Sequence, residues 1–118
     1  MRKMQRAGVL TLALACFTVL SVLAADDKPT QQQQREAAQK ASAAGNYKDA
    51  YEPLRKIALD DKADPRKVGS DLELGLQCLR NLGRVDEIDE FREGVIAAHG
   101  NNWRLLQTAA MTYADNRY

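Results

Sequence analysis

Amphipathic helical periodicity recurs along most of this 118-residue chain and constrains its fold more than any other feature. The clearest example begins at Tyr47, where apolar residues recur at offsets of 3, 4, 7, 10 and 11, which places them on one face of a helix. No alternation of apolar and polar residues marks a half-buried strand, and no Asn-Gly or Asp-Gly hairpin turn is present. The sequence therefore predicts an all-α fold.

Five helices are predicted, over about residues 31–44, 48–59, 65–82, 85–98 and 103–114. Each has apolar or small residues on one face and polar residues on the other. The inward faces of the first four are predicted, helix by helix, to be Ala37, Ala38, Ala41 and Ala44; Tyr47, Ala50, Tyr51, Leu54, Ile57 and Ala58; Val68, Leu72, Leu76, Leu79 and Leu82; Val85, Ile88, Phe91, Val95 and Ala98. The fifth helix begins with Trp103 and continues through Leu106, Ala110, Tyr113 and Ala114.

Helix starts carry capping signals. Thr30 and Gln33 form a capping box, in which the threonine oxygen accepts a backbone N–H at the helix start. Asp64 is a natural N-cap, and Pro65 suits the first helical position because its missing N–H costs nothing there. Asn101 or Asn102 is expected to cap the fifth helix.

Glycines are expected to mark two helix ends, and one proline lies inside a predicted helix. Gly83 is predicted to end the third helix and Gly100 the fourth. Pro53 lies inside the second stripe, where proline removes one backbone hydrogen bond and clashes with the preceding turn, at a cost of about 3 kcal/mol. We expect either a kink between Asp49 and Pro53 or a helix that begins later than the stripe suggests.

Residues 1–25 have the features of a targeting segment. Arg2, Lys3 and Arg6 precede an uncharged apolar run that ends in small residues, with Val22 and Ala24 at the positions a signal peptidase reads. The alternative is an uncleaved membrane anchor, because about 18 apolar residues can span a bilayer. A lipoprotein attached through Cys16 fits the flanking residues less well. We expect an exported protein, periplasmic or secreted, in contact with a membrane only if this segment is retained.

Removal of that segment leaves about 93 residues, enough for one small domain. Three of the 17 Lys and Arg residues lie in the segment, so 14 remain against 16 Asp and Glu, a formal charge of −2. This balance offers no basic stripe for nucleic acid. Cys78 alone would survive cleavage, so the mature chain cannot form an intramolecular disulfide.

An internal repeat follows from the turns. "GNY" at 45–47, "GRV" at 83–85 and "NRY" at 116–118 are spaced by 38 and 33 residues. These spacings bracket the period of about 34 residues of tetratricopeptide repeats. The stretch "GNYKDAYEPLRKIALDDKADP" resembles the second half of such a unit, and "NNWRLLQTAAMTY" resembles the start of the next, although Gln107 and Ile88 replace the expected small residues.

A second resemblance covers most of the mature chain. The run "GRVDEIDEFREGVIAAHGNNWRLLQTAA", preceded by "LGLQCLRNLG", is similar to the N-terminal helical region of bacterial alpha-2-macroglobulin-like proteins. The resemblance implies an exported protein in which a secretion signal and a few helices precede β-sandwich domains that trap proteases. The chain itself has no thioester motif, bait region or β-sandwich, so the resemblance assigns inhibitor activity to none of its residues.

The chemically versatile residues have structural interpretations. His99 is expected to interact with the dipole at a helix C-terminus, and Cys78 to be a buried thiol. The acidic run "VDEIDEFRE" is expected to be a solvated face, with a docking surface as the alternative. Trp103 is expected to pack between helices. We predict no catalytic, cofactor-binding or metal-binding residue, no cofactor and no enzymatic activity.

The predicted architecture is therefore a short solenoid of antiparallel helical hairpins of tetratricopeptide type, spanning residues 26–118. Its third repeat is expected to be cut at the hairpin hinge, which would leave Trp103, Leu106, Ala110 and Tyr113 without a partner helix. The expected function is a protein-interaction or spacer module, the N-terminal fragment of an alpha-2-macroglobulin-like endopeptidase inhibitor. The alternative is a stand-alone exported adaptor that binds a peptide or protein, which the alanine- and leucine-rich inner helices disfavour.

Overall fold

The computed structural model describes residues 27–115, and across that range the chain is all helical, as predicted. Its elements are α2 (Gln31–Ala43), α3 (Tyr47–Leu59), α4 (Val68–Asn81), the 3₁₀-helix η1 (Val85–Glu87), α5 (Ile88–Ala98) and α6 (Trp103–Ala114). The predicted targeting segment over 1–25 and the predicted turn at 116–118 lie outside the described residues.

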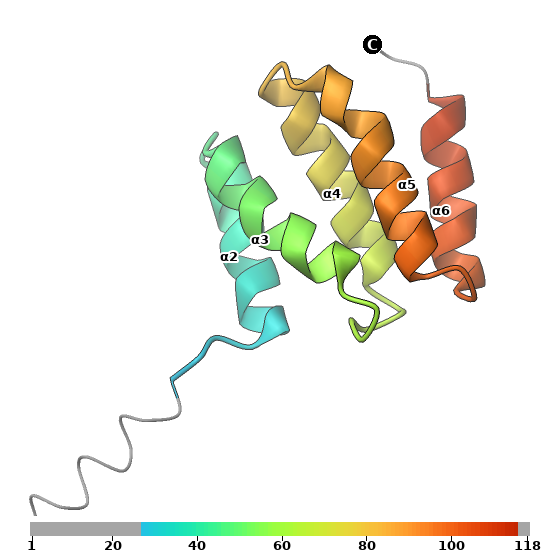
Figure 1. Ribbon diagram of the computed structural model, residues 1–118. Helices are drawn as coiled ribbons and strands as arrows, with labels where there is room; N and C mark the ends of the chain where they lie inside the picture. The colour runs from blue at the N-terminus through green and yellow to red at the C-terminus, as the bar shows by residue number, and fades with distance from the viewer. Residues whose placement is uncertain (1–26, 116–118) are drawn as a thin grey trace, which may run out of the picture.

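Each helix packs against the next along the chain, and helices two apart also touch (Figure 1). Contacts join α2 to α3, α3 to α4, and α4 to α5. In addition α3 contacts α5, α4 contacts α6, and α5 contacts α6. Two rows result, with α4 and α6 side by side in one and α3 and α5 in the other.

The hydrophobic core lies between these two rows and is continuous from α2 to α6. Aliphatic side chains dominate it, and Tyr51 meets Phe91 edge to face with ring centroids 5.5 Å apart. The predicted inward faces of α3 and α4 are confirmed, except that Tyr47 and Leu82 are only half-buried. The residues of α4 with no exposed surface are Val68, Leu72, Leu76, Cys78 and Leu79.

Two glycine turns have the same geometry. Gly45 and Gly83 have φ of 83° and 70°, a left-handed conformation that glycine adopts without steric cost. After α2, Asn46 N–H donates to Ala41 C=O at 2.8 Å; after α4, Arg84 N–H donates to the equivalent Leu79 carbonyl at 2.9 Å. Both turns are Schellman motifs, which satisfy the last carbonyls of a helix. The predicted role of Gly83 is confirmed, and the "GNY" and "GRV" turns are structural equivalents.

A buried ion pair joins α2 to α4. Arg35 Nε lies 3.0 and 2.9 Å from the two carboxylate oxygens of Asp71, and both side chains are almost fully buried. Burial raises the pKa of Asp71, while the hydrogen bond from Arg35 opposes that rise. The predicted all-alanine inner face of α2 is thus wrong in part, because Ala37 and Ala44 are exposed and Arg35 takes an inward position beside Ala38.

Helix α4 begins at Val68, later than the predicted start at Pro65. Asp64 does not cap the helix. Its side chain accepts a hydrogen bond from Arg66 N–H at 3.0 Å, and its carbonyl accepts from the backbone N–H groups of Lys67 and Val68. Such an Asx turn satisfies the backbone locally and delays the helix by one turn.

The predicted fourth helix is divided in two. Residues 85–87 form η1, where Arg84 pairs with Glu87, and the α-helix starts at Ile88. Val85 was expected to be buried but is 51% exposed, because the tighter 3₁₀ turn carries it outside the α5 stripe. Gly100 follows the C-cap His99 without a left-handed φ, so its predicted role as a conformational terminator is wrong.

Two of the predicted helix-capping signals are confirmed. The capping box at Thr30 and Gln33 is present, and Asn102 caps α6 by accepting from Leu105 N–H. Helix α3 starts at Tyr47 and continues through Pro53, so the later start offered as an alternative is wrong.

Gly75 supplies a test of the packing between α4 and α5. A Cβ at Gly75 would lie 2.7 Å from Phe91 Cε1, inside van der Waals contact. Overpacking costs about 1–3 kcal/mol, against a helix-propensity gain of at most about 1 kcal/mol. We therefore expect Gly75→Ala to lower the free energy of unfolding by about 1–2 kcal/mol in urea denaturation.

The matched control is Gly94→Ala in α5. Its Cβ would meet only Leu59 Cδ2 at 3.0 Å, the end of a flexible and half-buried side chain. This variant is expected to be neutral or slightly stabilising. Equal effects of the two substitutions would contradict the close approach of α4 and α5 at Gly75.

Candidate interaction surface

Helix α6 packs on the rest of the molecule through three residues that the sequence did not single out. Leu105, Ala109 and Thr112 are its buried residues, spaced by four and then three positions. The five apolar or small residues that the sequence analysis named along this helix are all exposed, namely Trp103, Leu106, Ala110, Tyr113 and Ala114. Nearly every residue of this helix is apolar or small, so periodicity alone could not distinguish the two faces.

The outer face of α6 carries what we call the terminal stripe, namely Trp103, Leu106, Ala110 and Tyr113. Trp103 is 66% exposed, Tyr113 43% and Leu106 38%, and Ala110 is exposed as well. The expectation that Trp103 packs between helices of this chain is wrong. A run of exposed large apolar side chains on one helix is unusual for a soluble surface and often marks a contact with another molecule.

The buried residues of α6 match those of α4 at a spacing of 33. Leu105, Ala109 and Thr112 occupy the positions of Leu72, Leu76 and Leu79, all of which have little or no exposed surface. Two of the three α6 side chains are smaller than their α4 counterparts. Helix α6 thus repeats the packing position of α4 with less apolar surface to bury.

A buried arginine compensates for part of this deficit. Arg92 of α5 is 1% exposed, and its guanidinium donates to Thr112 Oγ1 at 3.0 Å and to the Thr112 carbonyl at 3.2 Å. It also donates to Asp89 at 3.0 Å and lies 4.1 Å from the centre of the Tyr113 ring. Arg92 therefore holds α6 against α5 with charge-assisted hydrogen bonds, which are stronger than neutral ones.

Sequence reasoning missed Arg92 and Thr112. A signal for Arg92 was available, because it lies four residues after Ile88 and three before Val95, both of which are buried on the same stripe. A charged residue at such a position must be paired when it is buried. Its partner lies 20 residues further on, and no local pattern identifies it.

Four carboxylates of η1 and α5 are exposed, which agrees with the predicted solvated face: Asp86, Asp89, Glu90 and Glu93. Asp89 and Glu93, one helical turn apart, form what we call the acidic edge, and Asp89 bonds to Arg92 beside Tyr113. Glu90 instead lines a hollow with Tyr51 and Arg55 of α3. Between residues 85 and 98 the sequence contains a single cation, Arg92, and it is buried. The end of the molecule formed by α5 and α6 therefore combines an apolar stripe with an acidic edge.

A groove of about 510 Å³ runs between α4 and α6 on the other side of α6. Five of its six lining residues are polar, so the leucine-rich composition of α4 does not describe the side of that helix that borders the groove. The leucines of α4 point into the core and leave the polar positions outside. The groove is lined by Glu73, Gln77, Arg80, Met111, Thr112 and Asp115.

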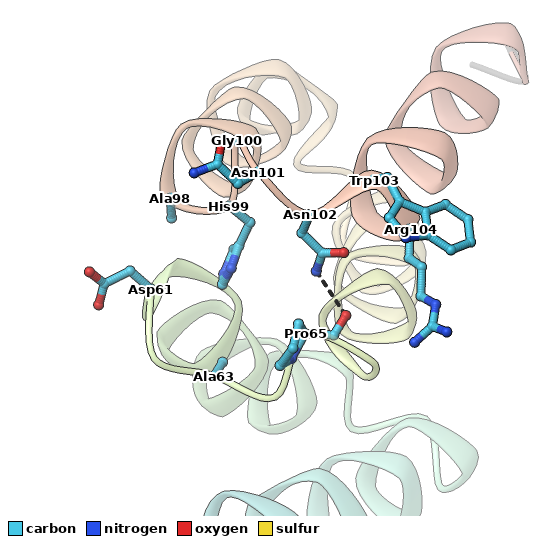
Figure 2. A pocket seen from close by; sticks show the side chains of 10 residues that line it. All are labelled: Asp61, Ala63, Pro65, Ala98, His99, Gly100, Asn101, Asn102, Trp103 and Arg104. Atoms are coloured by element: carbon cyan, nitrogen blue, oxygen red, sulfur yellow. Dashed lines mark hydrogen bonds between the residues drawn. The ribbon is translucent and has the colours of Figure 1, made fainter.

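A second cavity, of about 580 Å³, lies where the α3–α4 and α5–α6 connections meet (Figure 2). Two of its polar side chains hold these connections together. Asn102 donates to the Pro65 carbonyl at 2.8 Å, and His99 Nε2 lies 2.9 Å from the Ala58 carbonyl. His99 serves the packing of α5 on α3 with only 7% of its surface exposed, and the lining residues within 27–115 include no serine, threonine or cysteine.

Comparisons with known proteins return nothing: no family model, curated protein or solved structure matches the chain. In the described part of the chain, none of the helices has the length and apolar character to cross a membrane. Residues 27–115 also hold no group of three or more histidine, cysteine or acidic side chains that could bind a metal ion.

The Arg92 interaction can be tested by removing its hydrogen bonds while keeping most of its bulk. We expect Arg92→Met to lower the free energy of unfolding by about 2–3 kcal/mol, because hydrogen bonds of a charged donor are lost and the Thr112 carbonyl loses a partner. Hydrogen exchange of the backbone amides in residues 103–114 should accelerate more than exchange in α3. Arg104→Met, at an exposed arginine of α6, is the control and should change stability by no more than about 0.5 kcal/mol. Equal exchange rates in the two variants would contradict the role of Arg92.

The ionisation of two buried groups, the Cys78 thiol and the Tyr51 hydroxyl, is expected to lower the stability of the fold at high pH. Burial raises the pKa of the Cys78 thiol above its ordinary 9.0, although a hydrogen bond with Ser42 opposes the rise, and burial likewise raises the pKa of the Tyr51 hydroxyl above 10.0. The folded state holds both protons more tightly, so the unfolded chain loses them first as pH increases. Stability should be unaffected by these groups at pH 7 and should fall above about pH 9.

Urea denaturation at pH 7, 9 and 10.5 measures this dependence. The double variant Cys78→Ala with Tyr51→Phe should show a smaller loss of stability between pH 9 and 10.5 than the unmodified chain. An identical loss in both proteins would assign the alkaline effect to other groups.

Proposed function

We propose that this chain is a non-enzymatic protein-interaction module built from helical hairpins, and that α6 is the edge at which it joins another protein surface. The observation that supports this proposal is the terminal stripe. Two helical pairs cover one another, whereas α6, among the helices of the described range, packs on α4 and α5 and keeps the terminal stripe exposed to solvent. A helix that leaves a contiguous row of apolar side chains exposed is a candidate for contact with another protein.

A tetratricopeptide-like solenoid is the arrangement we propose for these helices. The two equivalent glycine turns, the contacts between helices two apart, and the 33-residue correspondence between α4 and α6 all support it. In such arrays each repeat buries its apolar surface against its neighbours, and an end left uncovered requires a partner or a capping element. The terminal stripe occupies that end.

The proposed setting is an exported protein of alpha-2-macroglobulin type, periplasmic or secreted. Support for this setting is the sequence resemblance of residues 74–110 and the targeting pattern in residues 1–25. In that setting the module is an interaction or spacer element of an endopeptidase inhibitor and has no inhibitory chemistry of its own.

A stand-alone adaptor that binds a peptide is the second candidate, favoured by the polar groove between α4 and α6. Glu73, Gln77 and Arg80 face it from α4, and Arg80 Nε is buried there without a hydrogen-bond partner. An extended peptide has donors and acceptors that suit such a lining. The groove and the terminal stripe lie on different sides of α6, so the two candidates can be tested separately.

Site-specific photocrosslinking in cells tests the interaction module. A benzophenone amino acid replaces Leu106 in the terminal stripe, or Ala37 on the exposed side of α2 as the control. We expect protein adducts to form from position 106 at least about tenfold more abundantly than from position 37. A partner that covers the terminal stripe would lie within reach of a crosslinker at position 106. A third position, Gln77, reports on the groove.

The outcomes distinguish the candidates. Crosslinks from position 77 alone would favour the peptide adaptor. Equal and weak crosslinking at all three positions would contradict the proposal that this domain joins another protein surface.

A further inference from the structure

We propose that the terminal stripe and the acidic edge of α5 together form a docking surface for a cationic amphipathic helix. The inference rests on the proposed interaction function and adds the chemistry of the partner. The partner helix would place an apolar ridge on Trp103, Leu106, Ala110 and Tyr113, and lysine or arginine side chains on its flank beside α5.

The shape of the surface suits a helix. Positions 103, 106, 110 and 113 are spaced by three, four and three residues, so they follow one line along α6. Ala110, between Leu106 and Tyr113, has a small side chain and so leaves room for a larger apolar side chain of a facing helix. Ridges of this kind interlock when two helices pack.

The negative charge beside the stripe indicates that the partner is positively charged. Tyr113 lies against Arg92 of α5, and Arg92 is bonded to Asp89, so Asp89 borders the stripe. Glu93 is exposed one helical turn from Asp89 on the same side of α5. Carboxylates at the rim of an apolar surface favour partners with cations at matching positions and repel acidic ones.

The same charges disfavour a second copy of this chain as the occupant. Two copies that packed stripe against stripe would bring their acidic α5 edges towards each other. Arg104, the one cation of α6, stacks on Trp103 at the far end of the stripe, 5.2 Å from the ring centre. In an antiparallel pair, Arg104 of each copy would approach the acidic edge of the other, but this is one cation against Asp89 and Glu93. A partner helix with several lysine or arginine side chains would supply more compensating charge.

Two synthetic peptides of 16 residues serve as probes. Both have leucine at every third or fourth position on one helical face, and they differ only in whether lysine or glutamate flanks that face. Trp103 is the only tryptophan in the chain, so its emission reports directly on coverage of the stripe. With the full chain, we expect the lysine peptide to shift this emission to shorter wavelength and to bind at least about tenfold more tightly than the glutamate peptide.

Four variants localise the binding. Leu106→Asp and Ala110→Asp place a charge in the stripe and should each weaken lysine-peptide binding at least about tenfold. Glu93→Lys, at an exposed position, should reduce the preference for the lysine peptide several-fold. Ala37→Asp on α2 is the control and should bind as the unmodified chain does. Circular dichroism melts of all variants separate loss of binding from loss of folding.

Equal affinity for the two peptides, no emission shift with either, or unchanged binding by both stripe variants would overturn the inference. A concentration-dependent dimer in sedimentation equilibrium that Leu106→Asp dissociates would also overturn it, in favour of a second copy. If position 106 crosslinks to protein in cells while neither peptide is preferred, the cationic partner is wrong and the interaction module stands. If position 106 gives no crosslink and the lysine peptide is not preferred, both fail.

Discussion

The burial of the α4 leucines is the interaction on which the other helices depend. Leu72, Leu76 and Leu79 are fully buried, and complete burial of an aliphatic side chain stabilises a fold by about 1.5–3 kcal/mol. Helices α3, α5 and α6 all pack against α4, and α2 reaches it through the Arg35–Asp71 ion pair. No other helix in the described range is in contact with so many neighbours.

That arrangement produces a gradient of packing from α4 to α6. At the positions of Leu76 and Leu79, α6 has Ala109 and Thr112, which bury less apolar surface. Hydrogen bonds from Arg92 supply part of the difference, yet an arginine in this position must first lose its hydration, and that loss offsets much of the gain. Helix α6 therefore has a less apolar attachment than α4, and it carries four of the five large hydrophobic side chains that are exposed in the described residues.

Sequence reasoning succeeded where a single residue determines the local conformation. Gly83 ends a helix because glycine adopts positive φ, and Asn102 caps one because its side chain accepts a backbone N–H. It succeeded also for α3 and α4, where apolar and polar residues are cleanly divided between two faces. It did not identify the packing face of α6, because apolar residues lie on both sides of that helix and only contacts with α4 and α5 show that Leu105, Ala109 and Thr112 face inward.

The polar interactions in the core could not be predicted from the sequence for a different reason. Arg35 and Asp71 are 36 residues apart, and each looks like an ordinary surface residue among its neighbours. Local competition also mattered at Asp64, where a side chain suited to capping a helix stabilises a turn in front of it. In the candidate surface, the sequence predicted that the terminal stripe would lack a partner but not that it would lie beside an acidic edge.

The weak attachment of α6 and its exposed stripe have a common physical consequence. A partner that binds only the docked form of α6 stabilises that form by RT ln(1 + [L]/Kd), which is about 2.7 kcal/mol at a hundredfold excess over Kd. The increment is comparable to what the Arg92 hydrogen bonds contribute. Occupation of the terminal stripe would thus strengthen the attachment of α6, and it would do so through Tyr113, which belongs to the stripe and also contacts Arg92. Binding at the outer face and order at the inner face of α6 are therefore coupled by contacts already present in the chain.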